Sequence, residues 1–171
     1  MSVVISPQLA QLRIGVANVK GTRVLDCGTL AIQGLEVTMV HADHSSAVIE
    51  EGRIAYGGEA AGFVVRFPSG IGVYHAGDTA LFGDMALIAE IYEPAVAMLP
   101  IGDCFTMSPR EAARACRLIR PRVVFPMHYG TFPELTGTVG AFRDALRGLP
   151  NVEVVAPKPG ETVVLSAARL L

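Results

Sequence analysis

The chain has 171 residues, 51% of which are hydrophobic, and a formal net charge of -2 at pH 7. This length can bury one sizeable core but is short for two domains, so we expect a single domain over residues 1–171. The near-neutral charge offers no basic surface to a nucleic acid, and no apolar run is long enough for a membrane span. Because the N-terminus also lacks the pattern of a secretory leader, we expect a cytoplasmic protein.

Two bulk properties suggest that another polypeptide covers part of the surface. The mean hydropathy is +0.43, although the chain has no Trp and only 18% charged residues. Such values are typical of a protein with apolar surface that is buried elsewhere, by a partner chain, a second copy or a missing segment. We therefore expect a homo-oligomer or a complex with a partner chain.

The first part of the chain is predicted to consist mainly of short strands, after a short helix over 7–14. Apolar and polar residues alternate over 35–40, which is typical of a half-buried strand, and this strand leads towards His44. Residues 50–62 are rich in glycine and mixed in charge. They predict a long loop, which is a candidate lid over a site.

The second part alternates strands with helices. Apolar runs at 62–67 and 71–75, joined by a Pro-Ser-Gly turn, predict a β-hairpin. A Ser-Pro-Arg-Glu string at Ser108 is a capping box with proline in the first turn, so a helix should begin there. This order predicts an α/β protein with a mixed sheet covered by helices. The remaining strands are expected over 95–101, 123–125, 152–155 and 162–165, and the helices over 81–92, 109–120 and 139–149.

Side chains capable of chemistry follow three of the predicted strands. His44 follows one strand, His75 and Asp78 follow another, and His128 follows a third. Ligand sites of α/β proteins commonly lie at such strand ends, and imidazole and carboxylate groups are ligands of Zn²⁺ and similar ions. The residues alone also allow an acid–base pair, in which Asp78 orients His75, and each histidine taken singly could be an ordinary loop residue.

Five strings stand out along the chain. They are HADHSS from His41, HAGDT from His75, LFGDM from Leu81, LPIGDCFTMSP from Leu99 and PMHYGTFP from Pro126. In this order they resemble metallo-β-lactamase-fold proteins, and most of all a branch of uncharacterised metal-dependent hydrolases similar to the L-ascorbate-6-phosphate lactonases. The likeness runs from about Val3 to Leu165. The resemblance implies an αββα sandwich with two metal ions between its halves.

The resemblance also implies a role for each site residue. His44 corresponds to a histidine ligand of the first metal, Asp78 to the carboxylate that bridges both metals, and His128 to a late histidine of the second. His75 precedes the bridging aspartate and is expected to line the pocket, so Asp78 and His75 are the catalytic candidates. Asp103 is expected either to orient a ligand histidine or to cap a turn. Zn²⁺ is the expected metal, with Mn²⁺ or Fe²⁺ as alternatives.

One departure from the family is large. Its members carry an early H-x-H-x-D-H string that supplies further ligands, whereas this sequence has four histidines and none before His41. The chain is therefore expected to be the C-terminal portion of the sandwich, truncated at its N-terminus. Each metal would keep one histidine and a shared carboxylate, although a catalytic zinc usually has three protein ligands. We expect weak or partial metal occupancy and no hydrolase activity of this chain alone.

Two classes of function follow from these observations. With the missing ligands supplied, the expected reaction is hydrolysis of a small-molecule ester, lactone or phosphoester by a metal-activated hydroxide. The alternative is a non-catalytic remnant or assembly subunit that acts through an exposed sheet. A nuclease is disfavoured because the chain lacks a basic face.

Overall fold

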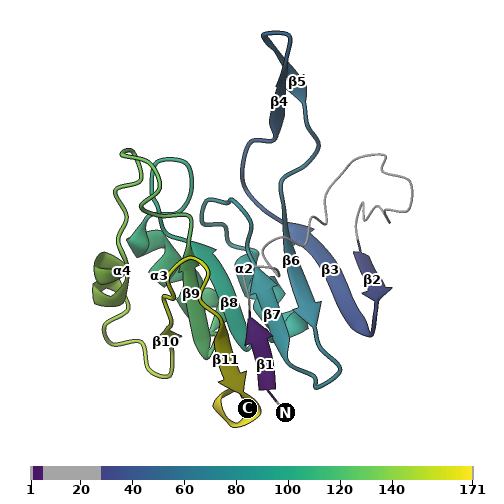
Figure 1. Ribbon diagram of the computed structural model, residues 1–171, viewed down its shortest axis with the longest axis vertical. Helices are drawn as coiled ribbons and strands as arrows, with labels where there is room; N and C mark the ends of the chain where they lie inside the picture. Colours follow the sequence, from purple (N-terminus) through teal and green to yellow (C-terminus); the bar gives the residue numbers. More distant parts are fainter. Residues whose placement is uncertain (1, 6–27, 171) are drawn as a thin grey trace.

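The computed structural model describes residues 2–5 and 28–170, and the helix predicted over 7–14 lies outside these ranges. A seven-stranded mixed sheet forms the centre, with the strand order β10-β9-β8-β7-β6-β3-β2 (Figure 1). The first strands are antiparallel up to β7, and β7 to β10 are parallel. The strands are β2 (Gly28–Ile32), β3 (Leu35–His41), β6 (Ala61–Arg66), β7 (Gly72–His75), β8 (Val96–Pro100), β9 (Val123–Met127) and β10 (Glu153–Val154).

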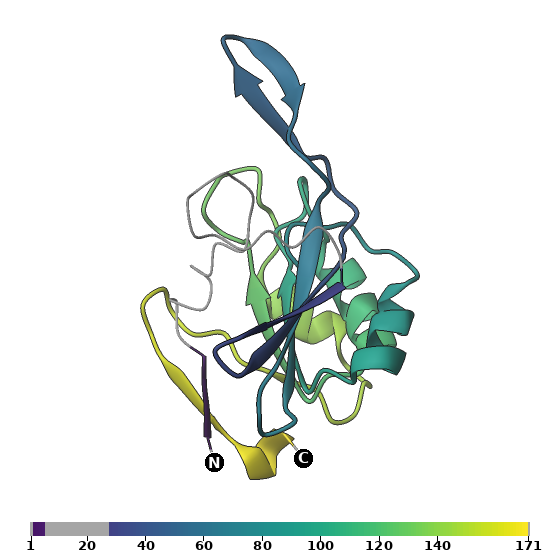
Figure 2. The same cartoon turned by 90° about the vertical axis from the view of Figure 1, so that its right-hand side faces the viewer.

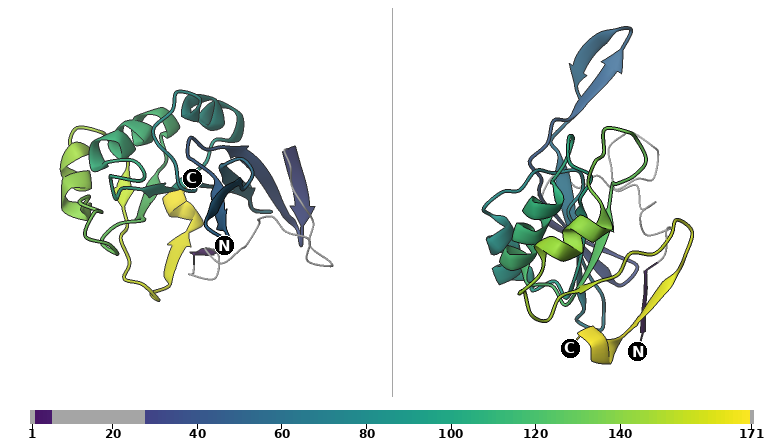
Figure 3. Two further views of the ribbon diagram at one scale, coloured as in Figure 1. Left: turned by 90° about the horizontal axis from the view of Figure 1, so that it is seen from above. Right: turned by 90° about the vertical axis from the view of Figure 1, so that its left-hand side faces the viewer.

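Three helices cover one face of this sheet (Figure 3). They are α2 (Met85–Tyr92), α3 (Pro109–Ile119) and α4 (Val139–Ala145). The buried side chains of α3 and α4 meet Tyr74, Leu99 and Val124, which point to this face from three neighbouring strands. Because helices connect the parallel strands, the carboxyl ends of β7, β8 and β9 lie at the same edge of the sheet.

A smaller layer covers part of the other face. Strand β1 (Ser2–Ile5) pairs antiparallel with β11 (Val163–Ser166), and α5 (Ala167–Leu170) follows. Leu165 packs there against Val73, Val96 and Val123, which form one row across the sheet. The sequence patterns did not indicate β1 or α5, each of which is four residues long. No helix in the described ranges is both long and apolar enough to cross a membrane.

The three helix starts predicted within the described ranges have different outcomes, and α4 begins at Val139 as predicted. The capping box is confirmed: Ser108 Oγ accepts a hydrogen bond from the Glu111 backbone N–H at 3.3 Å, and the Glu111 carboxylate accepts one from the Ser108 N–H at 2.8 Å. The start of α2 near residue 81 is wrong, since that helix begins at Met85. The Ala80 N–H bonds to the carbonyl of Asp43 at 2.8 Å, so a tertiary contact holds the preceding residues in a loop.

The long loop predicted over 50–62 is also wrong. Strands β4 (Ala47–Glu50) and β5 (Arg53–Tyr56) form a separate two-stranded sheet there, which projects from the body of the protein (Figures 1 and 2). Glu51 and Gly52 connect them with φ values of 49° and 75°, the positive pair that a tight type I′ hairpin turn requires. We call residues 47–56 the arm.

Candidate functional site

The loops after β7, β8 and β9 are fixed to one another at one edge of the sheet. The Ala76 N–H bonds to the Met98 carbonyl at 3.1 Å, and the Ile101 N–H bonds to the Met127 carbonyl at 3.0 Å. Gly102 lies so close to the His128 carbonyl oxygen that a Cβ on Gly102 would overlap it. These contacts hold the side chains that follow the three strands in defined positions.

Asp78 and His128 meet at this edge. Asp78 Oδ2 lies 3.7 Å from His128 Nε2, which is too long for a direct hydrogen bond but suits two groups that share a cation. His128 Nδ1 is buried and has no hydrogen-bond partner in the described ranges. The structure therefore brings together the predicted bridging carboxylate and the predicted late histidine, which come from loops after two different strands.

His44 lies in the short segment between β3 and the arm. Its Nδ1 lies 2.6 Å from the Ser45 carbonyl oxygen, so Nδ1 carries the proton and donates, and Nε2 is left with a lone pair that could bind a metal. Within residues 2–5 and 28–170, no three His, Cys, Asp or Glu side chains lie close enough together to hold a metal ion. The structure thus pairs Asp78 with His128 but does not add His44 to them, and the ligand role of His44 stays a prediction.

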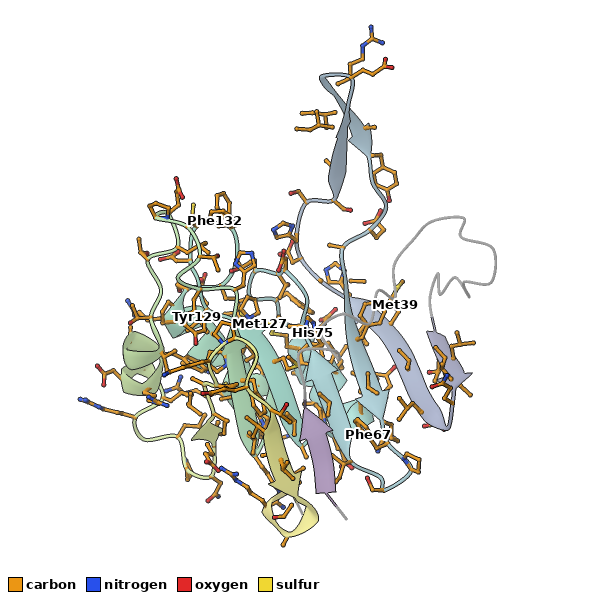
Figure 4. All side chains as sticks on the ribbon, viewed as in Figure 1. Met39, Phe67, His75, Met127, Tyr129 and Phe132 are labelled. Carbon is orange, nitrogen blue, oxygen red and sulfur yellow. The ribbon has the colours of Figure 1, made fainter. Side chains whose placement is uncertain are left out.

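His75 ends β7 and is held in one tautomer. Its Nδ1 accepts a hydrogen bond from the Gly77 N–H at 3.1 Å, so in the neutral ring Nε2 carries the proton. Burial lowers the pKa of His75 below its ordinary value, and the negative charge of Asp78 only partly opposes this. His75 is therefore a neutral hydrogen-bond donor at pH 7. Figure 4 shows it at the end of its strand, between Met127 and Met39.

Replacing His75 with glutamine is expected to reduce the pH dependence of folding stability. Burial depresses the pKa of His75 in the folded chain below 6.5, so the unfolded chain binds a proton at this histidine more readily. The free energy of unfolding therefore rises with pH between the folded and the unfolded pKa of His75. The contribution of neutral His75 is present above about pH 6.5 and is lost as the pH falls below it. Denaturant unfolding should show a greater loss of stability from about pH 7.5 to about pH 5 in the wild type than in the variant. Equal losses would contradict the assignment.

A network around Thr79 connects the site loops, although the sequence assigned it no role. The buried Thr79 Oγ1 accepts a hydrogen bond from the Asp43 N–H at 2.9 Å and donates one to the Ala80 carbonyl at 2.8 Å. The Met107 N–H bonds to the Thr79 carbonyl at 3.1 Å. Asp43, Thr79 and Met107 belong to three of the family-like strings, so the strings themselves were the available signal.

The remaining polar residues near the site have local contacts. Asp103 Oδ1 accepts from the Cys104 N–H at 2.9 Å, and Asp103 Oδ2 accepts from Thr136 Oγ1 at 3.5 Å. Of the two roles considered for Asp103, the structure supports the capping of a turn. His41 is exposed and stacks edge-on against Phe82, with ring centroids 5.1 Å apart.

The donor set at this edge fits a divalent metal in chemistry but not in number. Imidazole nitrogen and carboxylate oxygen suit Zn²⁺ and the neighbouring transition metals. Two converging ligands are fewer than the three protein ligands of a usual catalytic zinc site. A metal ion bound by Asp78 and His128 would therefore have only two converging ligands among the described residues.

Comparison with known proteins gives the family. Residues 5–129 match the protein family described as the beta-lactamase superfamily domain. The chain belongs to this superfamily. Its predicted membership and its predicted mixed α/β fold class are thereby confirmed.

Relatives within the superfamily are named as metal-dependent hydrolases. A UPF0173 metal-dependent hydrolase of Solibacter usitatus is 53% identical over 136 residues, which are 80% of this chain and 59% of that protein. One of Methanopyrus kandleri is 50% identical over 149 residues, 86% of this chain and 64% of that protein. This chain thus spans about three fifths of the length of these relatives.

A solved structure supports the same grouping. Igni18, a metallo hydrolase from the hyperthermophilic archaeon Ignicoccus hospitalis, is 34% identical with a TM-score of 0.74. The match covers 94% of this chain and 65% of that one. The arrangement of strands and helices seen here is therefore shared with a larger metallo hydrolase.

Proposed function

We propose that this chain provides part of the metal centre of a hydrolase that cleaves a small-molecule ester, lactone or phosphoester. The observation that carries the proposal is the approach of Asp78 Oδ2 to His128 Nε2 within 3.7 Å, at the edge where the ends of β7 and β9 meet. The names of the relatives support a divalent metal as the cofactor. The formal net charge of -2 disfavours a nucleic acid and so supports a small-molecule substrate. The location proposed for the reaction is the cytoplasm.

The residues of this chain have distinct parts in the proposal. Asp78 and His128 are ligands, and His44 is a third ligand supplied from the loop after β3. When bound, the divalent metal supplies a Lewis acid that polarises the scissile bond and lowers the pKa of an attacking water. Zn²⁺ fits the nitrogen and oxygen donors best, and Mn²⁺ or Fe²⁺ are alternatives.

His75 has a positioning part that does not require it to bind the metal. Its Nδ1 is occupied by the Gly77 N–H, so only the Nε2–H is free to interact with a substrate. A neutral donor of this kind can hold a carbonyl or phosphoryl oxygen as negative charge develops on it. The lowered pKa of His75 supports this role, because the ring stays neutral over the physiological range.

The proposal includes a second polypeptide, either a partner chain or another copy. Two converging ligands hold a metal weakly, and this chain spans only 59% and 64% of two relatives that are named as hydrolases. We therefore propose weak metal binding and no turnover by the chain alone. The other candidate, an assembly subunit without catalysis, is favoured by the exposed apolar side chains of the arm.

The deciding experiment measures metal content and hydrolysis with and without the missing ligands. This chain is compared with a chimera that carries, at its N-terminus, the part of the Solibacter relative outside the match. We expect the chimera to retain metal on dialysis and to hydrolyse a nitrophenyl ester, a lactone or a nitrophenyl phosphodiester, whereas this chain does neither. Tightly held metal and turnover in this chain alone would refute the partial-site proposal, and an inactive, metal-free chimera would favour the assembly subunit.

A further inference from the structure

The arm presents one largely apolar face to solvent. Ala47 pairs with Tyr56 and Ile49 pairs with Ile54 across the hairpin, so these four side chains point to the same side. Ile49, Ile54 and Tyr56 are 75%, 81% and 75% exposed. Large apolar side chains at this exposure, gathered on one face, indicate a surface that contacts another molecule.

The arm does not cover its own body. It leaves the sheet from β3 and β6 and extends away from it in two perpendicular views (Figures 1 and 2). A two-stranded hairpin without further packing is only marginally stable in water. Burial of the apolar face against a partner would therefore stabilise the arm as well as join the two molecules.

A complementary surface lies on the far side of β7 from the arm. It is a pocket of about 580 Å³ formed by the ends of β8 and β9 and by the loop before β11. Its apolar lining includes Met98, Phe125, Met127, Pro157 and Pro159, and His128 and Tyr129 also line it. The side chain of Tyr129 and that of Met127 are labelled in Figure 4. Because β7 and the arm-bearing strands separate the two surfaces, the arm of a second copy is a better occupant than the chain's own arm.

Each of the two surfaces carries one acidic and one basic side chain. The tip of the arm carries Glu51 and Arg53, and the loop that borders the pocket carries Lys158 and Glu161. An arm lying in the pocket can thus place an acid opposite a base and a base opposite an acid. Such pairing selects a register more than it adds affinity.

We propose that two copies of this chain form a two-fold dimer in which the arm of each lies in the apolar pocket of the other. A two-fold axis makes both contacts at once, which brings the interface towards the roughly 800 Å² per partner of a stable complex. Because His128 borders the pocket, each arm would then form one wall of the partner's site. The dimer itself does not depend on the proposed function; only the statement that each arm borders the partner's site rests on it.

The test is the mass of the protein in solution, measured by light scattering and sedimentation over a wide concentration range. The wild type should have about twice the chain mass of 18.1 kDa. Ile54→Asp should raise the dimer dissociation constant at least about tenfold, because it places a charge in the centre of the contact. Ile91→Asp is the matched control, since Ile91 is 63% exposed on α2, far from both surfaces in the fold, and should leave the dimer intact.

A charge exchange then tests the pocket itself. Glu51→Lys should weaken the dimer, and the double variant with Lys158→Glu should restore it. A monomeric wild type, a dimer unaffected by Ile54→Asp, or a double variant no tighter than Glu51→Lys would each overturn the proposal. Far-ultraviolet circular dichroism confirms folding of each variant, and zinc binding by the monomeric Ile54→Asp variant shows separately whether the metal proposal holds.

Discussion

Gly77→Ala is expected to remove a large part of the folding stability of this chain. Gly77 has a φ of 70°, in the left-handed region that favours glycine, and an added Cβ would overlap the carbonyl oxygen of Ala61. That oxygen belongs to the backbone at the start of β6 and cannot move aside as a flexible side chain could. Backbone strain and overlap together should cost about 3 kcal/mol or more, which is a substantial share of the usual 5 to 15 kcal/mol, roughly, of a domain.

Denaturant unfolding measures this loss, and Gly83→Ala is the control. Gly83 lies six positions further on at the other end of the same loop, its φ is outside the left-handed region, and no atom lies within 4 Å of a Cβ placed there. Its replacement should change the free energy of unfolding by no more than about 0.5 kcal/mol. If Gly77→Ala were as stable as Gly83→Ala, the close approach of Gly77 to the start of β6 would be disproved.

The central part of the fold could be predicted because local signals and tertiary structure agree there. Apolar runs bounded by turn residues marked β6 to β9, and the capping box at Ser108 fixed the start of α3. The placement of Asp78 and His128 at one edge followed from parallel strands, whose carboxyl ends meet. Their approach is thus a consequence of topology that the order of elements already implied.

Predictions from the sequence were wrong where a local pattern had two interpretations. Glycines and mixed charge over 50–62 indicated a loop, but the Glu51-Gly52 turn joins two short strands. Leu81 and Phe82 continued an apolar helical pattern, yet the loop before α2 is held by a hydrogen bond from a distant strand end. The sequence also could not show whether His44 reaches Asp78 and His128, because that depends on the orientation of a loop and not on strand order.

Asp78→Asn is expected to abolish the stabilisation of this chain by zinc while leaving the metal-free protein as stable as before. In the proposed metal site the Asp78 carboxylate is the charged ligand, and asparagine keeps its size without its charge. Removing it should weaken zinc binding at least about tenfold, since even residues that only orient a ligand contribute that much. The metal-free fold should tolerate the change because Asp78 is 54% exposed and lies 3.7 Å from His128, a pairing that stabilises little.

Thermal unfolding with increasing zinc separates these two effects. A metal that binds only the folded state raises the midpoint with concentration, so the wild type should show a rise that a chelator reverses, and Asp78→Asn should show almost none. Asp84→Asn is the control, because Asp84 precedes α2 on the same loop, is exposed and makes no side-chain capping bond. His128→Gln should behave as Asp78→Asn does. A rise of equal size in all four proteins would place the zinc elsewhere, and the approach of Asp78 to His128 would then be a structural contact without a ligand role.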